Sequence, residues 1–204
     1  MTNALNKTLA AIFVLVTIGA CSILPESDPV QLLDPRLPGP ETAAQGADWA
    51  LNIARPEADP ARDSNRVLIR TGQGQLQVHA SARWIAPAPE LLRTLLVRYL
   101  RDSGRLREVS AGAAGQDRTL VLDLRQFELN ESGGDQLQAQ IRVEAGLYDS
   151  RSSELLARRL FESRQSTASA QPDRILSGFE AALGEIIPAL ADWVTGHGSP
   201  DHDR

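Results

Sequence analysis

The stretch TLVLDLRQFELNESGGDQLQAQIRVEAGLY, residues 119–148, decides the fold. In its first part, Leu120, Leu122 and Leu124 share one side and alternate with residues that point the other way. In residues 136–148 every second position, from Leu137 to Leu147, is apolar. Alternation with a period of two is typical of a β-strand with one buried face. The stretch therefore predicts two strands of a sheet.

Shorter segments on either side predict further strands. They are residues 49–53, 66–70, 76–84, 106–110 and 155–161. In residues 76–84 the apolar side chains run from Leu76 to Trp84 on one face, and His79 alternates out of phase with them, so we expect His79 to be exposed. Residues 56–65 are polar and predict a loop, and Gly72-Gln73-Gly74 predicts a turn.

Two segments have the spacing of amphipathic helices. Residues 87–90, Pro-Ala-Pro-Glu, are a helix-entry signal, and Gly104 supplies the stop. The second helix is expected to start near Pro172. Its regular apolar stripe runs from Ile175 to Val194, and Pro188 should kink or divide it. The order strands, helix, strands, helix predicts an α+β fold: a mainly antiparallel sheet with two amphipathic helices packed on one face.

Residues 1–20 predict a lipoprotein signal peptide. Lys7 is their only charge, and residues 9–18 form an apolar run shorter than the about 20 residues that span a bilayer. The sequence Ile-Gly-Ala-Cys at residues 18–21 resembles the lipobox of bacterial lipoproteins. We therefore expect cleavage between Ala20 and Cys21 and lipid attachment on the Cys21 thiol. A plain secretory signal is the alternative, but it leaves the only cysteine of the chain unexplained.

The remaining chain divides into three parts. Residues 21–48 are rich in Pro and Gly and predict the lipid anchor with a flexible tether. Residues 49–195 are long enough for one domain with a core. Residues 196–204 predict a disordered polar tail. In many two-membrane bacteria an Asp after the lipidated cysteine retains a lipoprotein in the inner membrane, so Ser22 favours the outer membrane, facing the periplasm.

Charge and motifs exclude several functions. The net charge of −5 becomes −6 once Lys7 is removed, and every other basic residue is a scattered Arg. We therefore expect no nucleic-acid partner, because nucleic-acid binding needs a concentrated basic surface. The sequence has no nucleophile elbow and no HExxH motif. We expect no enzymatic activity, no catalytic residue and no cofactor, with an envelope hydrolase as the alternative.

Candidate polar sites are sparse. Asp59 and Asp63 are most simply solvated loop charges. A metal site in the tail, formed by His197 with residues Asp201, His202 and Asp203, is the weaker alternative to no metal at all.

Trp84 has two interpretations. Tryptophan is favoured in interface hot spots, so Arg83 and Trp84 are the candidate partner interface. The position of Trp84, where a strand meets the first helix, favours a place in the core instead. Trp49 and Trp193 are expected to pack in the core as well.

A set of short segments is spread over nearly all of the mature chain. In order, they are CSILP (21–25), WALNI (49–53), SNRVLI (64–69), ARWIAPAPELL (82–92), LDLRQFE (122–128), RLF (159–161) and the closing helix with Trp193. In order and spacing they resemble the ABC-type transport auxiliary lipoproteins, the PqiC-like group. The Arg-Trp and Pro-x-Leu-Leu segment carries most of this resemblance.

The resemblance implies a non-catalytic component of an MCE-type lipid transport system. Its partners would be an MCE-domain protein and an ABC transporter with permease and ATPase subunits. The lipoprotein would dock the system at the outer membrane and support envelope integrity, and a ring-shaped partner would favour a symmetric homo-oligomer. Only Cys21 carries over as a site residue. The alternative is a stand-alone assembly or structural lipoprotein of the outer membrane.

Overall fold

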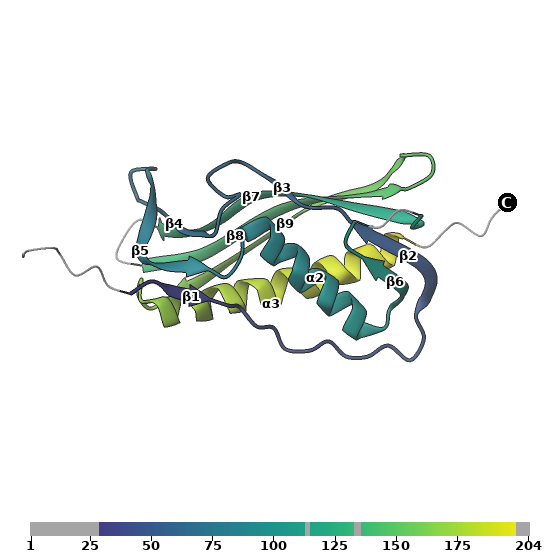
Figure 1. The fold of residues 1–204 in the computed structure, drawn as a ribbon, viewed down its shortest axis with the longest axis horizontal. Coiled ribbons are helices and arrows are strands. Elements are labelled where there is room, and N and C mark those ends of the chain that lie inside the picture. Colours follow the sequence, from purple (N-terminus) through teal and green to yellow (C-terminus); the bar gives the residue numbers. More distant parts are fainter. Residues whose placement is uncertain (1–28, 113–114, 133–135, 199–204) are drawn as a thin grey trace, which may run out of the picture.

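Three short strands lie one after another beside one long strand, β7, and run parallel to it. The structure, a computed structural model, describes residues 29–112, 115–132 and 136–198 (Figure 1). The strands are β1 (Gln31–Leu33), β2 (Ala47–Ile53), β3 (Glu57–Ala58), β4 (Arg66–Arg70), β5 (Leu76–Trp84), β6 (Leu106–Ser110), β7 (Arg118–Ser132), β8 (Gln136–Asp149) and β9 (Leu155–Thr167). The helices are α2 (Ala88–Ser103) and α3 (Pro172–His197).

The sheet is mixed, which corrects the predicted mainly antiparallel sheet. β7, β8 and β9 form an antiparallel meander, and β4 and β5 are antiparallel. However, β2, β3 and β4 all run parallel to β7, β6 runs parallel to β2, and β1 runs parallel to β5. Alternation of side chains reports which face of a strand is buried, but it carries no information on the direction of the neighbouring strand.

Most predicted elements are confirmed. β4, β5 and β6 have the predicted bounds, and β7 and β8 extend the predicted strands by a few residues. α2 ends before Gly104, which has a left-handed φ of 63°. β2 begins two residues earlier than predicted, and β9 continues to Thr167. In addition, the predicted polar loop contains β3, which is too short to show a pattern, and α3 continues through Pro188 as one helix.

Part of the predicted tether belongs to the folded domain. β1 pairs with the end of β5, and Leu33 is buried in the core. Farther along, the N–H of Ala43 donates to the carbonyl of Ser103 over 2.9 Å. The domain thus begins near Gln31 rather than at residue 49. Three strand residues in a proline-rich context are too few for alternation to reveal them.

The helices contact the sheet and each other on the side where the core lies. α3 contacts β8 and β9, and α2 contacts α3 and β6; in Figure 1 both helices lie on the same side of the long strands. At the centre, Trp84 packs edge-on against Phe127 and Phe179, with ring centroids 5.3 and 4.8 Å away. Edge-to-face packing of this kind adds to the stabilisation from area burial.

Two glycines of α3 make a matched pair for testing this packing. A Cβ on Gly178 would lie 2.4 Å from Cγ2 of Thr167, whereas a Cβ on Gly184 would have no neighbour within 4 Å. We expect Gly178→Ala to lower the free energy of unfolding by about 1–3 kcal/mol through overpacking. Gly184→Ala should raise it by up to about 1 kcal/mol through helix propensity. Urea unfolding of both variants measures this; equal gains would contradict the close approach of α3 to β9.

Candidate functional site

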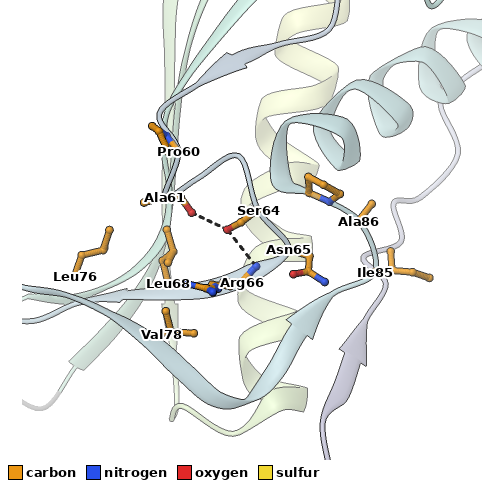
Figure 2. A pocket seen from close by; sticks show the side chains of 11 residues that line it. Pro60, Ala61, Ser64, Asn65, Arg66, Leu68, Leu76, Val78, Ile85 and Ala86 are labelled. Carbon is orange, nitrogen blue, oxygen red and sulfur yellow. Dashed lines mark hydrogen bonds between the residues drawn. The ribbon is translucent and has the colours of Figure 1, made fainter.

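An open recess of about 670 Å³ lies beside β4 and β5 (Figure 2). Its lining is mostly apolar and comes from the loop before β4, from both strands and from the segment that leads into α2. The lining residues are Pro60, Ala61, Ser64, Asn65, Arg66, Leu68, Leu76, Val78, Ile85, Ala86 and Pro87. Leu68 and Val78 lie opposite each other across the two strands, so their side chains share one face of the sheet.

Hydrogen bonds fix residues 59–65, the loop between β3 and β4 that forms one wall of the recess and is called here the wall loop. The Ser64 hydroxyl donates to the carbonyl of Ala61 over 2.7 Å, and the backbone carbonyl of Ser64 accepts from the N–H of Ala88 over 3.1 Å. The carbonyl of Asn65 accepts from the N–H of Trp84 over 2.7 Å. The wall is therefore tied both to the end of β5 and to the first turn of α2, and the recess is largely pre-formed.

A buried carboxylate on β7 holds the same loop through an ion pair. Glu128 on β7 is fully buried, and its carboxylate binds the guanidinium groups of Arg62 and Arg70; the Arg70 Nε lies 2.5 Å away. Arg62 also pairs with Asp59 within the loop. A buried charge is tolerated only when it is paired and hydrogen-bonded, and Glu128 meets both conditions.

The two loop acids are exposed, as expected for solvated loop charges, and each is also paired with an arginine. Asp63 binds Arg55 over 2.5 Å, and Asp59 binds Arg62. Partial burial raises the pKa of Asp59, but hydrogen bonds from the side chain and backbone of Arg62 outweigh it, so the pKa lies below its usual value. Asp59 is therefore ionised at neutral pH and holds Arg62 in place.

His79 is half-buried, so the prediction of an exposed side chain is wrong. Its Nδ1 accepts from the N–H groups of Ser81 and Ala82 over 3.3 and 3.1 Å. Nε2 lies 2.8 Å from the carbonyl of Ala170, so Nε2 carries the proton and donates. The ring thus ties β5 to the loop before α3, a structural role that alternation alone does not reveal.

The candidate interface residues do not offer free side chains. Trp84 is 1% exposed, which confirms its place in the core. The Arg83 guanidinium donates to the carbonyls of His79 and Ala82 over 2.6 and 2.7 Å. The next residue, Ile85, is instead exposed at the rim of the recess. Ile85 directly follows the two residues of the predicted interface, but nothing in the sequence pattern indicates that it is exposed.

Other predicted site residues lie at the termini. Ala20 and Cys21 lie outside the described residues, as do Asp201, His202 and Asp203. His197 is exposed near the end of α3, with Nδ1 2.8 Å from the carbonyl of Trp193. Within the described residues no three His, Cys, Asp or Glu side chains gather as a metal site would require. Neither helix of that part is long and apolar enough to cross a membrane.

The structure is thus an α+β domain with an open recess beside β4 and β5. The model of one family, the ABC-type transport auxiliary lipoprotein component, matches residues 31–191. The chain belongs to this family, and the match begins at β1, where the folded domain begins.

Solved structures share the fold. Protein XCC0632 from Xanthomonas campestris is 28% identical, with a TM-score of 0.80, over 86% of this chain and 100% of that chain. The hypothetical protein CT253 from Chlamydia trachomatis is 10% identical, with a TM-score of 0.54, over 76% of this chain and 98% of that chain. The second likeness shows the fold alone. No curated protein matches the sequence.

Family membership sets the general role. The chain is a lipoprotein component auxiliary to an ABC-type transport system. It is therefore a membrane-anchored protein of the cell envelope that associates with a transport system, and its family is not a known enzyme family.

Proposed function

We propose that this chain is a periplasm-facing lipoprotein component of an MCE/ABC-type phospholipid transport system. It is anchored in the outer membrane by lipid on Cys21, docks the transporter there and supports envelope integrity. The observation that carries this proposal is the family match over residues 31–191, which spans almost the whole described domain. The lipobox before Cys21 and the non-acidic Ser22 support the anchor and its outer-membrane location.

The anchor is tested by replacing its attachment residue. We expect Cys21→Ala to move the protein from the outer-membrane fraction, because each acyl CH₂ in the bilayer contributes about 0.8 kcal/mol and the variant has no acyl chain. Without cleavage, the variant should collect as the uncleaved precursor in the inner membrane. Fractionation on a density gradient with immunoblotting measures this. Ser22→Ala is the matched control and should keep the wild-type location; an unchanged Cys21→Ala distribution would refute the anchor.

The transport role is tested by genetic epistasis. Strains that lack this chain, the MCE-domain protein or both are compared for sensitivity to detergent and to large antibiotics. If both proteins serve one system, the double deletion should be no more sensitive than the more sensitive single deletion. Additive sensitivity would contradict the proposal and favour a stand-alone assembly lipoprotein.

A further inference from the structure

The exposed large apolar side chains of the described domain fall into two groups. One group, called here the β1–β5 patch, consists of Val30, Leu32, Leu76, Val78 and Ile85. The other group, on β9, consists of Leu155, Leu156 and Leu160. Single exposed apolar residues are ordinary, but several that cluster mark a contact surface.

The β1–β5 patch spans the sheet edge and the recess. Leu32 is paired with Arg83, and Ile85 follows two residues later, just after the end of β5. The N–H of Ile85 donates to the carbonyl of Leu33 over 3.0 Å, which holds it beside β1. Ile85 also lines the recess together with Leu76 and Val78 (Figure 2).

The two groups lie toward opposite ends of the molecule. The turn between β4 and β5 is bonded to the end of β7, where the N–H of Gly72 donates to Glu131 over 3.1 Å. Leu155 pairs with Tyr148 on β8, and Tyr148 in turn pairs with Thr119 at the start of β7. The strand residues between Thr119 and Glu131 rise roughly 40 Å. Figure 1 likewise shows β1, β4 and β5 at one end and the β8–β9 turn at the other.

The anchor enters at the end with the β1–β5 patch. Pro29, where the described chain begins, lies eight positions after Cys21. A fully extended chain covers these eight steps in at most about 26–29 Å. The β1–β5 patch is therefore the part of the domain that the lipid holds nearest to the bilayer, because Val30 and Leu32 follow Pro29 directly in the chain.

From this placement we propose that the β1–β5 patch rests on the bilayer surface and inserts Leu32 and Ile85 into the headgroup region. The inference rests on the proposed lipid anchor. Leu32 is 65% exposed and Ile85 54%, and Arg66 stands at the rim of the recess, where a guanidinium can meet lipid phosphates. The contact orients the domain with the β9 end away from the membrane.

The test places a fluorophore at either end of the full-length lipidated protein. Because Cys21 is the only cysteine and its thiol carries lipid, a new cysteine takes the label alone. Ile85→Cys and Leu32→Cys report on the β1–β5 patch, and Leu156→Cys is the matched control on β9. Each is labelled with an NBD dye and reconstituted into phosphatidylethanolamine–phosphatidylglycerol vesicles that carry a nitroxide quencher in the acyl chains. Flotation of the vesicles reports anchoring, and circular dichroism confirms folding.

We expect blue-shifted emission and quenching at residues 85 and 32 that is severalfold stronger than at residue 156. Flotation with no quenching at the β1–β5 patch, or with equal or stronger quenching at residue 156, would overturn the membrane contact and leave the anchor intact. Failure to float would overturn both. If the patch is quenched but the epistasis experiment shows no shared system with an MCE-domain protein, the membrane contact is supported and the transport role is refuted.

Discussion

Trp84→Ala should lower the free energy of unfolding by about 3–5 kcal/mol, as for other large aromatic truncations in a core. Trp84 is almost fully buried and joins four elements, because it lies on β5, pairs with Leu33 on β1 and packs against Phe127 on β7 and Phe179 on α3. The loss combines the transfer energy of the indole with a cavity that these elements cannot close. Urea unfolding followed by circular dichroism measures it.

Trp84→Phe is the matched control. The indole Nε1 has no hydrogen-bond partner in the described structure, so phenylalanine forfeits volume but no hydrogen bond. We expect a loss clearly smaller than that of the alanine variant. Equal losses of unfolding free energy would mean that a phenyl ring recovers none of the packing energy, which would contradict the packing account. A negligible loss for Trp84→Ala would contradict its place in the core.

Glu128→Gln should lower the free energy of unfolding by about 3 kcal/mol, the cost of breaking a buried ion pair by removing one partner. The neutral amide leaves Arg62 with only Asp59 and removes the carboxylate partner of Arg70. Because Arg62 lies in the loop that walls the recess, that loop should also become more open to proteolysis. Urea unfolding and limited proteolysis measure the two effects.

Asp123→Asn on the same strand is the control for the loss of one negative charge. Asp123 pairs with Arg125 over 3.0 Å, but both side chains are exposed. An exposed pair contributes only about 0–1 kcal/mol. Similar losses for the two variants would mean that Glu128 is not a buried partner of the two arginines.

Side-chain periodicity predicted the individual elements well. The alternation in β7 and β8, the apolar stripes of α2 and α3 and the stop at Gly104 are local properties, and the structure places these elements where they were expected. The parallel direction of β2, β3 and β4 along β7 depends on how the chain returns to the sheet. The alternation of side chains in a single strand does not determine this direction.

The recess depends on tertiary contacts that no local pattern encodes. Leu76 and Val78 belong to the apolar set of β5, but they stay exposed because the wall loop covers only part of the sheet face. The ion pair between Glu128 and Arg62 joins β7 to a loop that is distant in the sequence, and it was not identified from the sequence. Trp84 was predicted correctly, because an apolar position at a strand–helix junction is usually buried.

The most direct measurement is an affinity pull-down of the full-length lipidated protein from membranes after gentle crosslinking, with partners identified by mass spectrometry. Cys21→Ala serves as the control that should lose its partners with its anchor. The account predicts recovery of MCE-domain and ABC permease subunits with the wild-type protein. Recovery of only outer-membrane or cell-wall proteins, with the transporter expressed in the same cells, would contradict it.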